Sequence, residues 1–297
     1  MRKVKVITDS CADLNAEQLN EYDISYAKMT TTCDGVESAA LLTWTRDEAR
    51  EHYNKMRDGK RILTAQVALD EFQRVFEEYL KQDMDVVYVA CSSGQSSSVN
   101  TGAVVAKKLM AEYEGSTIIC IDSLNASMGE GMLAIEAAKM ASCGSSATEI
   151  EAHLLSVRKK VNQYVTVHSL DALKRAGRVK GSAAFFGNLM GVKPIIIADA
   201  NGEQAAYKKV KGRQKSFEEI VALLKSTIIK PENQVVYITH ADCAKEEIDS
   251  LVDLIKQEIP CIDIEVGFIG PIIGASIGPD AVGIWGFGKE VTFKIGD

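Results

Sequence analysis

Short runs of β-branched and other apolar residues alternate with amphipathic helical segments along most of the chain. Residues 4–8 and 85–91 have the composition of buried strands, and residues 69–80 place large apolar side chains on one helical face. This alternation predicts a mostly parallel sheet with helices on both faces. The same patterns predict a further strand at residues 116–121 and helices at residues 45–57, 101–112, 129–142 and 148–161.

The second half of the chain has a different pattern, which predicts a mixed sheet. Residues 192–197 and 205–210 have strand patterns, and Asn201-Gly202 between them is a strong signal for a β-hairpin. Because 297 residues exceed the size of a typical single-core domain, we expect two α/β domains, 1–160 and 161–297. The other elements predicted in this half are strands at 164–167, 234–239, 261–266, 282–285 and 291–295, helices at 170–176, 183–189, 216–228 and 244–259, and a glycine-rich loop at 267–278.

The net charge and the positions of the cysteines exclude several classes of partner and site. The formal net charge of −7 argues against nucleic acid or an anionic membrane as the main partner, because both attract basic surfaces. The seven cysteines include no Cys-x-x-Cys pair and lie mostly in apolar runs, which predicts buried free thiols and no metal site. No apolar segment is long enough to span a bilayer and no signal-peptide pattern is present, so we expect a cytoplasmic protein.

One catalytic signature is present but incomplete. Gly274-Ala275-Ser276-Ile277-Gly278 matches the G-x-S-x-G pattern of serine hydrolases, in which an acid and a histidine follow the nucleophile. No histidine follows Ser276, and the preceding Gly-Pro pair and Pro279 do not fit the strand–turn–helix setting of that motif. We therefore expect no catalytic centre, and a serine hydrolase using Ser276 is the alternative interpretation.

Hydroxyl-rich loops follow several of the predicted strands. In an open α/β sheet ligands bind where such loops converge, and hydroxyl and main-chain N–H groups suit an anionic head group. Serine and threonine are also common turn and N-cap residues, so each loop alone has a purely structural explanation. Four such loops at successive strand ends favour a binding site. The loops are Thr8-Asp9-Ser10, Thr64-Ala65-Gln66, residues 92–98, and Asp122-Ser123 with Ser127.

Short motifs in these loops and beyond them occur in a characteristic order from one end of the chain to the other. They are Val6-Ile7-Thr8-Asp9-Ser10 with Asp13-Leu14, Thr64-Ala65-Gln66, Ser92-Ser93-Gly94-Gln95-Ser96, Asp122-Ser123 with Ser127-Met128-Gly129-Glu130-Gly131, Leu173-Lys174-Arg175-Ala176-Gly177-Arg178-Val179, Lys193-Pro194-Ile195-Ile196, Val210-Lys211-Gly212-Arg213 and Gly270-Pro271-Ile272-Ile273-Gly274. Each motif alone is weak, but in this order and spacing the chain resembles the DegV family of fatty-acid-binding proteins.

The resemblance implies two α/β domains with the acyl chain of a long-chain fatty acid, such as palmitate, buried between them. It implies that Thr64 and Ser96 hold the carboxylate and that Arg178 and Arg213 contact phosphate or a partner. The neighbouring candidates for the head-group site are Ser93, Ser97, Ser127 and Ser276. The best-understood family members are carrier subunits of a bacterial fatty acid kinase. They present the carboxylate to a separate ATP-using subunit and carry the acyl phosphate toward phospholipid synthesis, with no cofactor of their own.

The chain departs from the family pattern near its C-terminal end. Where the family has His-Thr-Gly-Pro-Gly, this sequence has Ser276-Ile277-Gly278-Pro279-Asp280. Ser276 replaces a histidine that helps hold the carboxylate in relatives, and Asp280 adds a negative charge near the expected head-group site. A neutral hydroxyl gives up the stronger charge-assisted bond, so a carrier of a different amphiphile is a third interpretation. The expected apolar walls are Phe185-Phe186, Leu189-Met190 and Phe268-Ile269.

Overall fold

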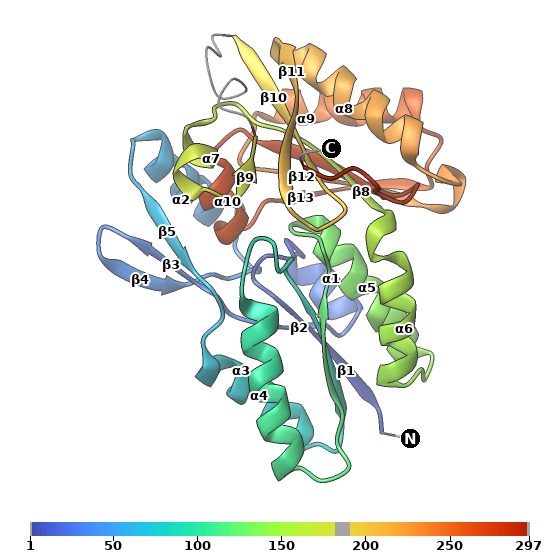
Figure 1. Ribbon diagram of the computed structural model, residues 1–297. Helices are drawn as coiled ribbons and strands as arrows, with labels where there is room; N and C mark the ends of the chain where they lie inside the picture. Colours follow the sequence, from blue (N-terminus) through green and yellow to red (C-terminus); the bar gives the residue numbers. More distant parts are fainter. Residues whose placement is uncertain (1, 182–190, 296–297) are drawn as a thin grey trace.

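Four parallel strands form the sheet of the first part of the chain, in the order β2–β1–β6–β7 (Figure 1). The computed structural model describes residues 2–181 and 191–295. Along β6, Val86 and Tyr88 face α3 and α4, whereas Val87 and Val89 face α5 and α6. The predicted parallel sheet with helices on both faces is therefore confirmed. Its elements are β1 (Val4–Asp9), α1 (Ala16–Glu21), β2 (Ser25–Ala27), α3 (Leu69–Leu80), β6 (Asp85–Ala90), α4 (Ser98–Glu112), β7 (Ile118–Asp122), α5 (Met128–Ser142) and α6 (Ala147–Val157).

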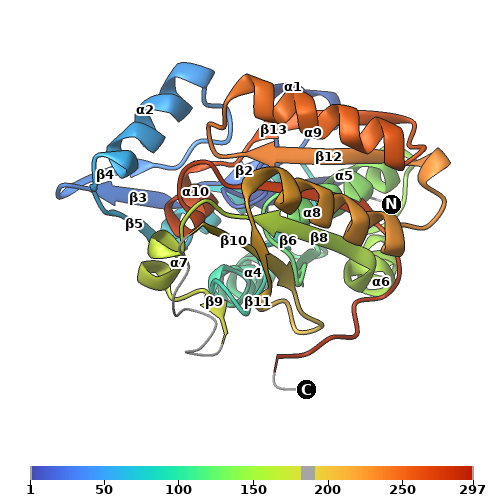
Figure 2. The same cartoon turned by 90° about the horizontal axis from the view of Figure 1, so that it is seen from above.

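A small antiparallel sheet beside this core was not predicted. Its strands are β3 (Thr30–Cys33), β4 (Val36–Ala39) and β5 (Ile62–Ala65), in the order β4–β3–β5, and α2 (Arg46–Arg57) connects β4 to β5. Each strand has four residues, and all of β4 is exposed, so the sequence lacks the apolar alternation that marks a longer strand. Figure 2 places this sheet and α2 on one side of the molecule, near α10.

Seven strands form the mixed sheet of the second part, in the order β13–β12–β14–β8–β10–β11–β9. Figure 1 shows α8 and α9 on its outer face, and α5 of the first part packs on the inner face, where Gly129 approaches Trp285. The predicted hairpin is confirmed, because β10 and β11 pair antiparallel. The elements are β8 (Val161–Thr166), α7 (Asp171–Ala176), β9 (Val179–Lys180), β10 (Val192–Ala198), β11 (Gln204–Lys211), α8 (Arg213–Thr227), β12 (Val235–His240), α9 (Lys245–Glu258), β13 (Asp263–Phe268), α10 (Pro271–Ile277) and β14 (Val282–Phe287), with short 3₁₀ turns at Arg158–Lys160 and Pro231–Asn233.

The tip of this hairpin contacts the first part of the chain. Gly202 has a φ of +76°, which favours glycine, and its carbonyl oxygen accepts a hydrogen bond from Ser92 Oγ at 2.8 Å. A Cβ added at Gly202 would lie 2.8 Å from the Cα of Leu124. The turn can therefore approach the loops after β6 and β7 closely only because residue 202 has no side chain.

Two sequence predictions in the second part are wrong, and a third falls outside the described residues. The glycine-rich loop predicted for residues 267–278 is wrong over Pro271–Ile277, which form α10, because proline is well suited to the first turn of a helix. The strand predicted for residues 291–295 is also wrong: these residues form no strand, and the Ala200 N–H donates to Phe293 O while the Val291 N–H donates to Lys159 O. The helix predicted for residues 183–189 lies outside the described residues.

The two large sheets share one hydrophobic core. The strands of the four-stranded sheet end at Asp122, and those of the seven-stranded sheet begin at Val161. One cluster of buried side chains nevertheless includes Val87 of β6, Leu133 of α5 and Trp285 of β14. The division into domains 1–160 and 161–297 therefore stays a prediction. None of the helices within residues 2–181 and 191–295 has the length and apolar character needed to cross a bilayer.

Candidate functional site

A polar pocket of about 350 Å³ lies at the carboxyl ends of β1 and β6, against β5 and α10. This is the edge of the parallel sheet at which α/β proteins bind ligands. Six of the residues singled out in the sequence line this pocket, from four separate parts of the chain. They are Thr64, Ser93, Ser96, Ser97, Arg178 and Ser276.

Thr64 and Ser96 are brought together by a small hydrogen-bond network. Thr64 lies on β5, and the loop that carries Ser96 joins β6 to α4. Ser98 links the two segments: its N–H donates to Ser96 Oγ at 3.2 Å, and its own Oγ accepts from the Val67 N–H at 3.3 Å. The two residues that the resemblance assigns to the carboxylate therefore reach one pocket from different segments.

Helix α4 begins beside the pocket with Ser97 as its N-cap residue. The first N–H groups of a helix lack partners within the helix, and the helix dipole places partial positive charge at this end. Ser97 and Ser93 are both exposed, so their hydroxyls are open to solvent. This end of the pocket is suited to an anion.

An apolar slot of about 50 Å³ adjoins the polar pocket and lies between the two large sheets. Gln95, Arg178, Ile273 and Ser276 line both cavities, so the slot continues from the pocket. Its apolar walls come from both parts of the chain and include Ala126, Val165, Leu173, Ile196, Ile277 and Trp285.

The predicted apolar walls are only partly found. Ile269 lines the slot, but the Phe268 ring packs against His240, with 4.7 Å between ring centroids, and does not line it. The other expected wall residues, Phe185, Phe186, Leu189 and Met190, lie outside the described residues.

Two predicted site residues are engaged elsewhere. Ser127 lines the slot rather than the polar pocket, and its Oγ donates to Asp13 Oδ2 at 2.5 Å. Arg213 lines neither cavity; it pairs with Glu247 at 3.1 Å and stacks over Phe217. Their assignment to the ligand therefore stays a prediction, without contacts to the polar pocket that would support it.

The charge expected from Asp280 is compensated. Asp280 Oδ1 lies 2.7 Å from Arg57, which also pairs with Asp242, and Asp280 lines neither cavity. Because Arg50 also pairs with Asp242 at 3.5 Å, two guanidinium groups balance the two carboxylates of this cluster.

Asp13 is a residue whose role the sequence did not reveal. Its carboxylate is buried and accepts hydrogen bonds from Ser127 Oγ and from the Gly270 N–H at 2.8 Å, which joins the turn after β1 to the start of α10. Burial raises the pKa of this carboxyl group to about 7, although both hydrogen bonds act in the opposite direction. Asp13 belongs to a motif singled out in the sequence. Its hydrogen-bond partner Gly270 is distant in sequence, so nothing in the sequence indicated this contact.

Ser276 does not have the setting of a hydrolase nucleophile. It lies in the last turn of α10 rather than in a sharp turn between a strand and a helix. No histidine is among the described residues that line the polar pocket or the slot. The structure thus gives no geometric support to the serine hydrolase alternative.

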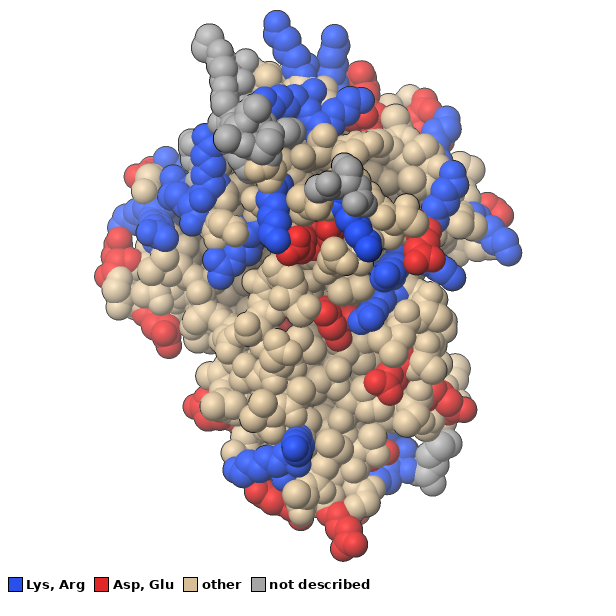
Figure 3. All heavy atoms as spheres, in the orientation of Figure 1, with Lys and Arg blue, Asp and Glu red and all other residues tan. Residues whose placement is uncertain are grey.

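Basic side chains surround one side of the pocket. Lys60, Arg61, Arg175 and Arg178 line a smaller basic cavity of about 100 Å³, which shares Thr64 and Ser276 with the polar pocket. Figure 3 shows that lysine and arginine gather on the upper half of this face, over the mixed sheet and its neighbours. The four basic residues of this cavity give their side of the pocket a local positive charge, although the protein is acidic overall.

Comparison with known proteins identifies the family. A family model described as "Uncharacterised protein, DegV family" matches residues 3–288. The chain belongs to the DegV family. A DegV domain-containing protein of Clostridium perfringens, CPE0026, is 33% identical over 297 residues, which cover 100% of this chain and 99% of that protein.

Two solved DegV structures have the same fold. DegV from Bacillus subtilis, described as a fatty acid binding protein, is 25% identical with a TM-score of 0.82, and the match covers 97% of this chain and 100% of that one. A second structure, described as showing fatty acid binding by a DegV family protein from Thermus thermophilus, is 23% identical with a TM-score of 0.86. The match covers 97% of this chain and 100% of that one. The predicted α/β fold class and DegV resemblance are therefore confirmed.

Asp13 makes the stability of this DegV protein depend on pH. Its pKa is raised from 3.8 in the unfolded chain to about 7, so the folded state holds the proton more tightly. Its contribution to the free energy of unfolding is fully present below pH 3.8 and is lost as the pH rises through about 7. Relative to wild type, Asp13→Asn should gain up to about 1.4 kcal/mol of stability per pH unit across this interval.

Urea unfolding of both proteins between pH 4.5 and 8 measures this difference. Asp253→Asn, an exposed position on α9, is the matched control and should give a curve parallel to wild type. A parallel curve for Asp13→Asn as well would contradict the raised pKa.

Proposed function

We propose that this chain binds a long-chain fatty acid, with the acyl chain in the apolar slot and the carboxylate in the polar pocket against Thr64 and Ser96. The observation that carries the proposal is the direct continuation of a hydroxyl-lined pocket at a helix N-terminus into an apolar slot between the sheets. Fatty acids are amphiphiles with these two parts. The family relatives described as fatty-acid-binding support the same ligand.

The acyl chain supplies most of the affinity in this arrangement. Each methylene moved from water to apolar surroundings contributes about 0.8 kcal/mol, so some ten methylenes contribute roughly 8 kcal/mol before ordering costs. A hydrogen bond to a charged carboxylate adds about 1.5–3 kcal/mol at most, and less where solvent competes. Thr64 is exposed, so we infer that the hydroxyl groups mainly orient the head group.

Binding of a whole acyl chain requires the slot to widen. Its volume of about 50 Å³ is far below the roughly 300 Å³ at which ligand pockets begin. Two of its walls lie on short helices, Leu173 on α7 and Ile277 on α10. We infer that movement of these helices relative to the inner face of the mixed sheet makes room for the ligand.

We further infer that the protein is a carrier and that a separate fatty acid kinase subunit acts on the bound carboxylate. The head-group end of the pocket is open to solvent at Thr64, so another protein can reach it. The basic cavity beside Thr64 and Ser276 suits the phosphate that a kinase would transfer to the carboxylate. This role needs no nucleophile or general base from the carrier itself.

Native protein should carry long-chain fatty acid after purification. Denaturing extraction of several preparations, followed by mass spectrometry, should find about one fatty acid per chain, because burial of the acyl chain makes its release slow. Consistently empty protein, also unable to take up added palmitate, would count against the proposal.

Removing the two hydroxyl groups should weaken carboxylate binding. Thr64→Ala combined with Ser96→Ala should lower palmitate affinity at least about 10-fold, because each lost hydrogen bond to a charged group costs more than 1 kcal/mol. Thr31→Ala, on the strand paired with Thr64, is the matched control. Unchanged palmitate affinity in the double variant would favour a carrier of a different amphiphile.

Arg178 should matter more for phosphoryl transfer than for fatty acid binding. Arg178→Ala should slow acyl phosphate formation by a fatty acid kinase ATP-binding subunit at least about 10-fold while fatty acid occupancy stays close to wild type. Arg213→Ala is the comparison, since its guanidinium lines neither cavity and is paired with Glu247. Equal phosphorylation rates for Arg178→Ala and wild type would contradict the proposed role of Arg178 in phosphoryl transfer.

A further inference from the structure

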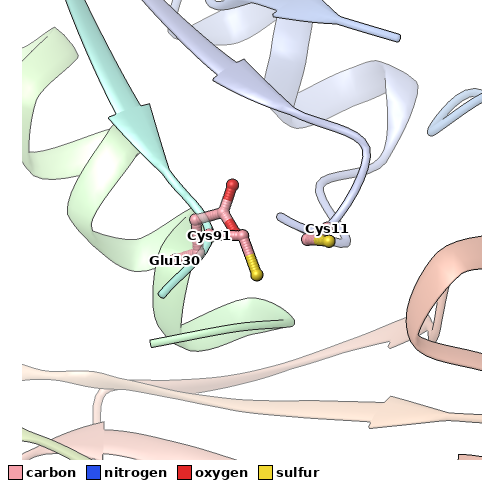
Figure 4. A group of neighbouring side chains, drawn as sticks. All are labelled: Cys11, Cys91 and Glu130. Carbon is pink, nitrogen blue, oxygen red and sulfur yellow. The ribbon is translucent and has the colours of Figure 1, made fainter. Parts of the chain in front are cut away.

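Two cysteines and a glutamate from three different elements meet directly behind the polar pocket. Cys11 lies in the turn after β1, Cys91 follows β6, and Glu130 lies in the first turn of α5 (Figure 4). Their two sulfur atoms and a carboxylate oxygen all lie within 4.8 Å of one another. All three residues are at most 2% exposed. The cluster is therefore an interior site with preplaced donor atoms.

Asp9 holds the two cysteines in place. Its Oδ1 accepts the Cys11 N–H at 2.9 Å, and its Oδ2 accepts the Cys91 N–H at 3.1 Å and Tyr88 Oη at 2.6 Å. The carboxylate thus joins the two main-chain segments that carry the thiols. Such outer hydrogen bonds orient ligands in metal sites.

Glu130 has an oxygen without a partner. Its Oε1 accepts a hydrogen bond from Thr8 Oγ1 at 2.7 Å, whereas Oε2 is buried and has no partner among the described residues. A buried carboxylate oxygen left unsatisfied is costly and rare. A metal ion bound to Oε2 would remove the free-energy cost of leaving this oxygen unsatisfied.

The cluster contains several acidic groups and no basic one. The interactions acting on Cys11 come from Cys91, Asp9 and Glu130, and neither carboxylate takes part in an ion pair among the described residues. A bound cation would supply the positive charge that the described residues around this buried acidic cluster do not.

The polar pocket gives access to the cluster. Cys11, Cys91 and Met29 all line it, and Met29 Sδ lies 3.6 Å from Cys11 Sγ. A cation could enter from this side and would keep one coordination position facing the pocket or the thioether.

We propose that Cys11, Cys91 and Glu130 form a binding site for Zn²⁺, with the fourth position open toward the polar pocket. Thiolate and carboxylate are both zinc ligands, and sulfurs bound about 2.3 Å from a tetrahedral zinc lie about 3.8 Å apart, within the range that these side chains occupy. Binding forms two Zn–S bonds and one Zn–O bond, and the thiol and carboxyl protons pass to solvent. This site does not depend on the binding of a fatty acid.

Cobalt and zinc titrations of the full-length protein test the proposal. Protein treated with a chelator and kept reduced with a phosphine should bind one Co²⁺ per chain with a thiolate-to-metal charge-transfer band, and Zn²⁺ should displace the Co²⁺. Cys11→Ser and Cys91→Ser should each weaken Zn²⁺ binding more than about 100-fold, because even outer-shell substitutions cost 10–100-fold. Glu130→Gln should weaken binding but keep the charge-transfer band, since both sulfurs remain.

Two cysteines elsewhere supply controls. Cys143 is exposed and Cys120 lies on β7, so Cys143→Ser and Cys120→Ser should bind metal as wild type does. If a variant of the cluster fails to fold, alkylation of wild type with and without Zn²⁺ replaces it: peptide mapping should find Cys11 and Cys91 protected by the metal. The proposal is overturned if the charge-transfer band is absent, if it persists without Cys11 or Cys91, or if Zn²⁺ protects neither thiol.

Discussion

Two buried carboxylates at the end of β1 determine how the pocket is built. Asp9 accepts main-chain N–H groups from Cys11 and from Cys91, and Asp13 accepts one from Gly270. A buried carboxylate is stable only where donors surround it, so these bonds constrain the segments that supply the donors. The turn after β1, the loop after β6 and the start of α10 are held in this way. These segments also line the polar pocket, whose shape therefore depends on the placement of two acids that the sequence alone does not explain.

The sequence predicted those parts of the fold that have long, regular patterns. Helix α3 was predicted with both of its ends correct, because its apolar residues recur on one face over twelve residues. The β10–β11 hairpin followed from Asn201-Gly202. By contrast, β3, β4 and β5 have four residues each and little buried apolar surface, so no periodicity marks them. Helix α10 was missed because glycine and proline were interpreted as a loop, although proline fits the first turn of a helix.

The sequence placed some candidate site residues in the polar pocket, but it could not show which of them are engaged elsewhere. Thr64, Ser96 and Ser276 line one pocket, whereas the side chains of Ser127 and Arg213 are engaged with Asp13 and Glu247. Residue type alone could not separate these two groups, because both contain polar side chains in family motifs. The cluster of Cys11, Cys91 and Glu130 could be predicted even less well from the sequence. Its members are far apart in sequence, and only the pairing of β1 with β6 and the packing of α5 bring them together.

The contact between the hairpin tip and the loop after β6 has a mechanical consequence. Gly202 O accepts hydrogen bonds from Ser92 Oγ and from Gln95 Nε2, so the tip touches the loop that carries Ser93, Ser96 and Ser97. On the same hairpin, β10 contributes Ile196 to the wall of the slot. The hairpin therefore connects a wall of the slot to the hydroxyl-bearing loop, so a shift of β10 that widened the slot would also change the support of that loop. Because a side chain at residue 202 would collide with Leu124, this connection requires glycine at that position.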